Sequence, residues 1–242
     1  MSRWAISFSL VVGWVASAVA QTSGGTAGET VSLEALIQQG GWAMYPLGLF
    51  SLAMLYFIIR NSLMLRERAM LRPDLKDEIE AFMRRRDVAG LRALCAEHDS
   101  LMTTVLDAGM QRVEEAGEFD PSLVMEAVED MSNEQMVGFM KPINYLSIIG
   151  GTAPMLGLLG TVSGMIKAFS VISQGGMGDP GKLAGSIGEA LITTATGLVI
   201  AIPAMMAYFV FKNNFIKTLS TMGRLVGHYL NVYRFANKSE EA

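Results

Sequence analysis

The stretch LAGSIGEALITTATGLVIAIPAMMAYFVF, residues 183–211, decides the class of fold. It meets the roughly 18–25 mainly apolar residues that a helix needs to cross a bilayer core. It contains one carboxylate, Glu189, which is followed by Thr193, Thr194 and Thr196. A charged side chain inside a bilayer is costly and usually faces a bundle interior, a water-filled cavity or an ion path. We therefore expect a membrane protein, with Glu189 as the first candidate functional residue.

Two further stretches, residues 42–59 and 142–166, contain no charged side chain. About half of all residues are apolar (51%) and only 17% are charged, which is a low share for a soluble domain. Three such runs buried in a soluble protein would need a much larger domain around them. We predict an all-α integral membrane protein with long cytoplasmic helical extensions and three transmembrane helices, at residues 41–60, 142–173 and 183–211.

The amino terminus has the features of a secretory signal peptide. Arg3 precedes a short apolar core, and Ala18-Val19-Ala20 forms a small-residue cleavage site before polar sequence begins. The alternative is a retained extra helix, but the apolar core is short for a span. We predict a signal peptide at residues 1–20, followed by a periplasmic segment at residues 21–40.

Basic residues beside the spans predict the orientation. The loop at residues 174–182 contains one basic residue, Lys182, whereas the other flanks of the spans contain Arg60, Arg66, Arg68, Arg72, Lys141, Lys212 and Lys217. Because basic residues collect on the cytoplasmic side, we expect a periplasmic amino terminus and loop 174–182 and a cytoplasmic carboxyl terminus. Residues 61–141 then form a cytoplasmic helical domain, and residues 212–242 form a cytoplasmic helical tail. No basic patch with interleaved aromatic residues suggests a nucleic-acid partner.

Two patterns predict helices outside the membrane. Asp120-Pro121 is a typical N-cap and first-turn pair, so a helix should begin there and run towards Lys141. After the third span, apolar residues recur at alternating steps of four and three, which predicts that this helix continues beyond the membrane. These residues are Phe215, Leu219, Met222, Val226, Tyr229 and Tyr233. They can pack on the chain's own helices or between subunits, and the two interpretations are compatible.

The second span contains small residues suited to close helix packing. Gly157, Gly160 and Gly164 lie at steps of three and four, and a small-xxx-small spacing lets helix backbones approach in lipid. Thr161 can line an aqueous path, although hydroxyls in such helices more often bond their own backbone.

Other chemistry is not indicated by the sequence. His98, His228 and Cys95 have no metal-ligand spacing, so we expect no metal or cofactor. The nucleotide-binding pattern GxxxxGK[ST] is absent, and we expect no ATP hydrolysis and no enzymatic activity.

Two segments resemble the signature segments of the MotA/TolQ/ExbB proton-channel family. They are LGLLGTVSGMI, residues 156–166, and IGEALITTATGLVIAIPA, residues 187–204. The resemblance extends from about residue 42 onwards and is strongest for the ExbB and TolQ branches. The four-span flagellar stator subunits fit less well.

The resemblance implies a homopentamer in the bacterial inner membrane, in contact with membrane lipids, whose second and third helices line a pore. A dimer of single-span partners similar to ExbD or TolR, each with a membrane aspartate, is expected in that pore. By position, Glu189 matches the motif glutamate, and Thr161 and Thr194 match pore threonines. Flow of H+ would then drive a TonB-like or TolA-like transducer.

Helical periodicity and the resemblance differ on the third span. Thr193 and Thr196 are four and seven residues after Glu189 and share its face, whereas Thr194 is turned away. Both statements hold if Glu189 bonds a neighbouring subunit while Thr194 faces the pore, so Thr193 and Thr196 are the weaker candidates. Two classes of function stay open: an ion-driven energy transducer, and a membrane scaffold in which Glu189 only makes an interhelical hydrogen bond.

Overall fold

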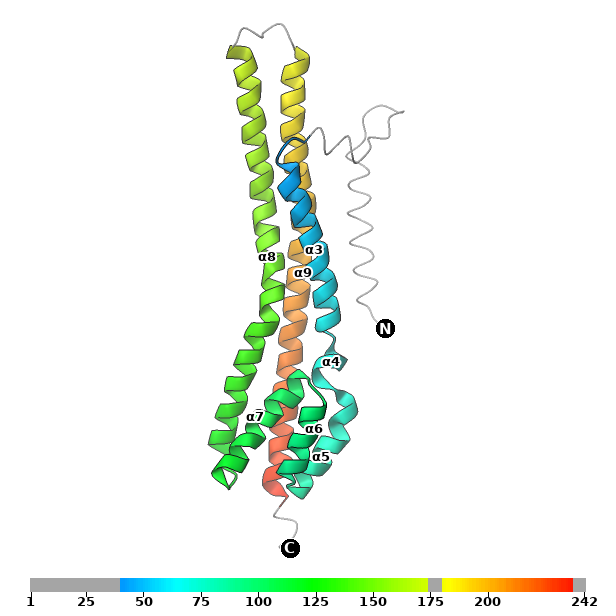
Figure 1. Cartoon of the computed structure of the whole chain (residues 1–242), viewed down its shortest axis with the longest axis vertical. Helices are drawn as coiled ribbons and strands as arrows, with labels where there is room; N and C mark the ends of the chain where they lie inside the picture. The colour runs from blue at the N-terminus through cyan, green and yellow to red at the C-terminus, as the bar shows by residue number, and fades with distance from the viewer. Residues whose placement is uncertain (1–39, 174–179, 237–242) are drawn as a thin grey trace. The chain divides into compact units, whose positions relative to one another are not determined.

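Three helices of the chain are long and apolar enough to cross a membrane. In the computed structural model, which describes residues 40–173 and 180–236, these are α3 (Met44–Met64), α8 (Pro121–Ser173) and α9 (Pro180–Phe235). The described residues contain helices and turns but no strand, and the predicted all-α architecture with three candidate membrane helices is confirmed (Figure 1). The predicted signal peptide, residues 21–39 and residues 174–179 lie outside the described part of the chain.

The polypeptide divides into two compact units, each built from segments distant in sequence. In its described part, the first unit comprises residues 40–59, 144–173 and 180–209, and the second comprises residues 60–143 and 210–236. The shorter elements belong to the second unit. They are α4 (Glu67–Leu71), the 3-10 turn η1 (Pro73–Leu75), α5 (Lys76–Arg85), α6 (Val88–Glu97) and α7 (Leu101–Ala116).

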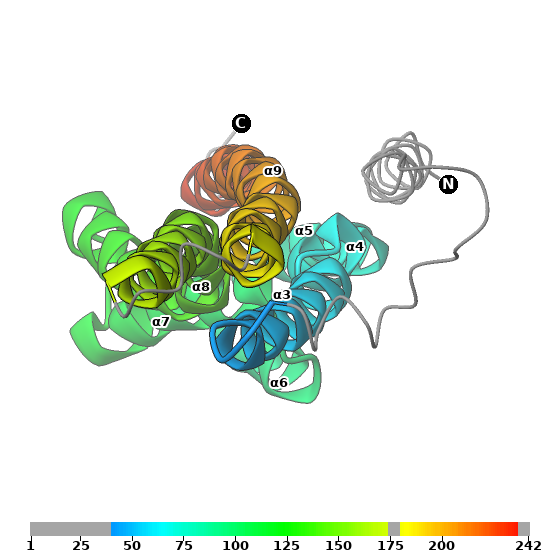
Figure 2. The same cartoon turned by 90° about the horizontal axis from the view of Figure 1, so that it is seen from above.

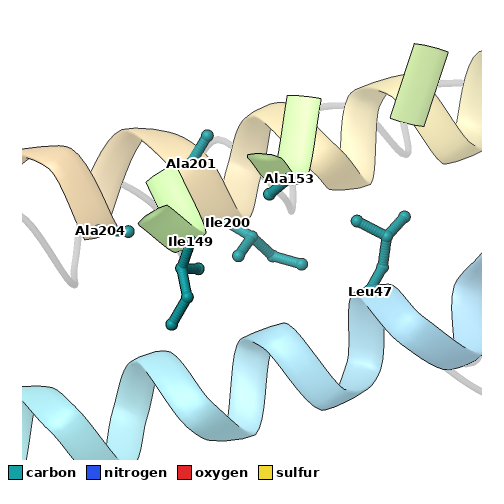
Figure 3. Close-up of a cluster of buried hydrophobic side chains, with 6 residues drawn as sticks. All are labelled: Leu47, Ile149, Ala153, Ile200, Ala201 and Ala204. Atoms are coloured by element: carbon teal, nitrogen blue, oxygen red, sulfur yellow. The ribbon is translucent and has the colours of Figure 1, made fainter. Parts of the chain in front are cut away.

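In the first unit, α3 packs against α8 and α9, as the end-on view also shows (Figure 2). The core of this contact combines a few branched side chains with alanines (Figure 3): Leu47, Ile149, Ala153, Ile200, Ala201 and Ala204. Alanine adds little bulk between helices, so their backbones come close enough for van der Waals packing. That packing is the main attraction between helices in lipid, where burial of apolar surface brings little gain.

Local sequence signals define the helix ends of the second unit. Asp87 caps α6 by accepting a hydrogen bond from the backbone N–H of Gly90. Ser100 and Thr103 form a capping box at the start of α7, and Gly117 ends this helix in the left-handed conformation, with φ 71°. Each cap satisfies backbone groups that a helix end leaves without a partner. The carboxylate of Asp120 accepts from the N–H of Ser122 at 2.8 Å as α8 begins.

The two long helices continue well past the membrane segments predicted from hydropathy. The helix expected from Asp120-Pro121 does begin at Pro121, but it passes Lys141 without a break. The third predicted span likewise continues to Phe235. The helical backbone continues through both helices even though the interior prolines Pro142, Pro154 and Pro203 each lack the N–H of one helical hydrogen bond. The change from charged to apolar sequence therefore alters the surroundings of each helix without ending it.

The apolar stripe on α9 belongs to the second unit and packs against other residues of that unit. Five of its six residues are buried and Leu219 is partly buried. The ring of Phe215 stacks on Phe139 with centroids 5.7 Å apart, and Tyr233 contacts Phe119 at 5.1 Å. Arg86 donates from Nε to the carbonyl of Tyr233 at 3.2 Å. Of the two interpretations drawn from the sequence, packing on the chain's own helices accounts for the burial of this stripe.

Candidate ion site

Glu189 forms an ion pair with Lys167. Glu189 lies in the first part of α9, and its Oε1 is 2.6 Å from Nζ of Lys167 near the end of α8. The exposed fractions of the two side chains are 21% for Glu189 and 48% for Lys167. A hydrogen bond between two charged groups is among the strongest in proteins. The ion pair therefore offsets part of the free-energy cost of placing a charged Glu189 in an apolar segment.

The turn before α3 covers the carboxylate. Gly41 has a φ of 64°, in the left-handed region where glycine is favoured, and a methyl group placed on its Cα would overlap Oε1 of Glu189. The next residue, Trp42, donates from its indole N–H to Oγ of Ser163 at 3.3 Å. Ser163 lies one helical turn before Lys167 on α8, so the turn is held beside the ion pair.

The three glycines predicted for helix packing face α9 of the same chain. A Cβ on Gly157 would lie 2.9 Å from the carbonyl oxygen of Thr193, and one on Gly164 would lie 2.8 Å from that of Ser186. Gly160 lies against the side chain of Thr193. This close approach of α8 and α9 brings Lys167 within reach of Glu189.

The threonines donate their hydroxyl protons to backbone carbonyls. Thr193 is buried and donates to Ala190 at 2.8 Å, and Thr194 reaches across to Gly157 on α8 at 3.1 Å. Thr161 and Thr196 bond within their own helices, to Leu158 at 2.7 Å and to Ile192 at 2.8 Å.

Thr193 and Thr194 thus both lie against the Gly157 region of α8, although helical periodicity separates Thr194 from the face of Glu189. Thr161 and Thr196 adopt the backbone-bonded arrangement common for hydroxyls in membrane helices.

Lys167 is the site residue that the sequence analysis missed. It follows directly after the charge-free run 142–166 and lies within the predicted span 142–173. A lysine inside a span that accompanies a membrane carboxylate is a candidate counter-ion, because intramembrane charges usually pair with one another. That signal was present in the sequence, but the pairing itself depends on how α8 lies beside α9.

The chemistry of the site is that of an acid and a base in direct contact. A carboxylate can accept a proton and an ammonium can donate one, whereas threonine hydroxyls orient water without readily taking up a proton near neutral pH. Within the described residues, His, Cys, Asp and Glu side chains form no group of three or more that could hold a metal ion. Candidate membrane-spanning helices with a charged pair between them define an integral membrane protein, and the pair makes ion or proton transfer its candidate function.

Comparison with known proteins identifies the family. A sequence model of the MotA/TolQ/ExbB proton channel family matches residues 97–223, a range that includes Lys167, Glu189 and both signature segments. The chain belongs to this family, and the resemblance noted in its sequence is confirmed.

Several relatives are biopolymer transport proteins named ExbB. The chain is 41% identical to ExbB of Neisseria gonorrhoeae over 109 residues, which are 43% of this chain and 49% of that protein. It is 39% identical to ExbB of Xanthomonas campestris over 104 residues, covering 43% and 40%. An ExbB-like protein of Synechocystis is 32% identical over 178 residues, covering 70% and 66%. The chain spans about half the length of the Neisseria protein.

Proposed function

We propose that this chain is the multi-span, ExbB-like subunit of a proton-driven motor in the bacterial inner membrane, coupling H+ flow to a TonB-type transducer that powers outer-membrane transport. The main support for the proposal is the position of Glu189. This carboxylate lies in a candidate membrane helix within the region that matches the family, and its Oε1 is 2.6 Å from Nζ of Lys167. A carboxylate kept in this costly position is a natural carrier of protons.

The proposed motor draws its energy from the membrane rather than from a reaction that the chain catalyses. A membrane potential supplies about 2.3 kcal/mol per elementary charge per 100 mV. We propose that the chain is not an enzyme and needs no cofactor, since H+ is the transported ion. The amino terminus is proposed to be periplasmic and the carboxyl terminus cytoplasmic.

The proposed assembly is a homopentamer that surrounds a single-span partner similar to ExbD or TolR. Glu189 is the only carboxylate within the three predicted spans. A second acid is needed to relay a proton through the middle of the membrane, and a membrane aspartate of the partner would supply it. Glu189, Thr161 and Thr194 are proposed to face the ion path, with Thr193 and Thr196 as weaker candidates.

Two other functions are compatible with the site. A TolQ-like subunit, working with a TolA-like transducer in envelope maintenance, would use the same site. A non-conducting scaffold is favoured by one observation: the Glu189 carboxylate and the threonine hydroxyls already have partners within the chain. In that case the glycines and the ion pair would only hold α8 against α9.

Proton flux into liposomes tests these functions. The chain should conduct little alone, and adding a single-span protein with a membrane aspartate, encoded beside it, should create a flux that is lost when that aspartate becomes asparagine. Glu189→Ala should abolish the flux, and Glu189→Gln should retain more if hydrogen bonding matters more than charge. Glu134→Ala is the matched control, because this exposed carboxylate lies on α8 outside the predicted spans.

The outcomes separate the alternatives. Strong flux from the chain alone would point to a self-sufficient transporter, and no flux with an assembled partner would favour the scaffold. Loss of TonB-dependent uptake, or instead of envelope integrity, in cells carrying Glu189→Ala would distinguish the ExbB-like from the TolQ-like function.

A further inference from the structure

We propose that the ammonium of Lys167 acts as the bound cation of the candidate ion site. It excludes metal cations such as Na+ from Glu189, so that only protons can reach this carboxylate. This inference rests on the proposed ion-conducting function and deepens it by assigning a residue that determines ion specificity.

The ammonium already occupies the position that a metal cation would need. Its Nζ lies 2.6 Å from Oε1 of Glu189, in direct contact with the carboxylate. A metal cation bound to the same carboxylate would lie close to this second positive charge. Like charges at such short range repel each other, and a protein site screens that repulsion less than bulk water does.

The charge count of the first unit supports the same conclusion. Lys167 and Glu189 are the only charged residues in the stretches 44–59, 144–173 and 183–209, and the described helices of the first unit contain one further charge, the positive Lys182 at the start of α9. The site is therefore neutral while the pair is intact, and it has no excess negative charge to attract a cation. Without Lys167, an uncompensated carboxylate would remain, and a mobile cation would be the simplest replacement for the lost ammonium.

The turn before α3 and the close approach of α8 and α9 narrow the space beside the carboxylate, whose side chain is 21% exposed. The backbone at Gly41 stands against Oε1, and the Trp42–Ser163 hydrogen bond holds this turn on α8. A Cβ on Gly164 would lie 2.9 Å from Cβ of Ala190, the residue after Glu189. A metal cation must exchange its hydration shell for several oxygen ligands. A proton needs only one oxygen, so it can reach Glu189 without such a shell.

Carbodiimide labelling of Glu189 tests the exclusion without any need for ion flux. The purified full-length chain in detergent is treated with dicyclohexylcarbodiimide in NaCl or in choline chloride, and the modified Glu189 peptide is measured by mass spectrometry. A cation bound at the carboxylate slows this reaction. We expect the same labelling rate in both salts for the wild type, and labelling several-fold slower in NaCl for Lys167→Met.

Matched variants separate charge from packing. Lys167→Arg retains the positive charge and should stay insensitive to Na+, whereas Lys167→Gln should respond like Lys167→Met. Lys182→Met removes the neighbouring lysine at the start of α9 and should behave like the wild type. Protection of wild-type Glu189 by Na+ would overturn the proposal, even if the Lys167 variants failed to fold. Equal labelling of folded Lys167→Met in both salts would overturn it too.

Flux measurements with the single-span partner distinguish this inference from the proposed function. Wild-type proton flux should be the same in NaCl and in choline chloride, and Na+ should inhibit the Lys167→Met flux several-fold. Absence of flux from every variant, together with the expected labelling pattern, would overturn ion conduction but support cation exclusion by Lys167. Wild-type flux inhibited by Na+ would overturn the exclusion while supporting conduction.

Discussion

Gly157→Ala tests whether close backbone approach holds α8 against α9. A Cβ at this position would lie 2.9 Å from the carbonyl oxygen of Thr193 and 3.0 Å from Cα of Thr194. Both atoms belong to the backbone of α9 and cannot turn aside as a side chain can. The added methyl group must therefore push the two helices apart. Gly151 is the matched control, because a Cβ there would meet no atom within 4 Å in the chain.

The expected cost follows from these contacts. Forcing an extra methyl group into a well-packed interface costs about 1–3 kcal/mol. Separation of the helices also weakens the 3.1 Å hydrogen bond from Thr194 to the Gly157 carbonyl, and interhelical hydrogen bonds in membranes average about 0.6 kcal/mol. Replacing glycine by alanine within a helix gains up to about 1 kcal/mol in backbone propensity. Since both variants receive that gain, the difference between them isolates the clash.

Unfolding in mixed micelles measures this difference. The helical circular dichroism signal is followed as the fraction of sodium dodecyl sulfate increases, and the midpoints of Gly157→Ala and Gly151→Ala are compared. We expect Gly157→Ala to be less stable than Gly151→Ala by about 1–3 kcal/mol. Equal midpoints would refute the close packing of α8 on α9 at Gly157.

Three further predictions concern the second unit and the topology. Burial raises the pKa of the Cys95 thiol to about 12, so iodoacetamide at pH 8 should alkylate it roughly a hundredfold or more slowly in the folded chain than after unfolding, as mass spectrometry can measure. The hydrogen bond from Arg84 lowers the pKa of Glu80 below 4.5. Its stabilising effect is present above pH 4.5 and is lost as the pH falls through the lowered pKa, so Arg84→Gln should reduce the loss of stability between pH 6 and pH 3 in unfolding titrations. In a Cys95→Ser background, a cysteine at Gly176 should react with a membrane-impermeant thiol reagent added outside, and one at Ser239 should not; the reverse pattern would overturn the orientation.

Sequence alone was sufficient to predict the class of fold. Long charge-free runs predict membrane helices because the thickness of the bilayer sets their length, and no tertiary information is needed for that inference. The start of α8 at Pro121 was also predictable, since Asp120 and Pro121 act on backbone groups within one helical turn. The family could be recognised from its two signature segments, which lie in order along the chain.

The tertiary structure decided which residues meet. Glu189 was evident as an intramembrane carboxylate, but its partner Lys167 lies 22 residues earlier and on another helix. Sequence periodicity assigns a residue to a face of its own helix but does not reveal which helix that face contacts or at what height. Close contacts between α8 and α9, among them those of Gly157, Gly160 and Gly164, set the relative height of the two helices.

Contacts between segments distant in sequence also explain why the Glu189 carboxylate is partly covered and why the apolar stripe on α9 is buried. No local pattern around Gly41 points to Glu189, which is 148 residues away, and the contact follows from the position of α3 beside α9. The stripe from Phe215 to Tyr233 could be identified from its spacing, whereas its cover by the chain's own helices could not. Local chemistry in the sequence therefore determined the helices and the candidate carboxylate, and the close packing of small residues, which sets the height of one helix against another, determined the ion pair.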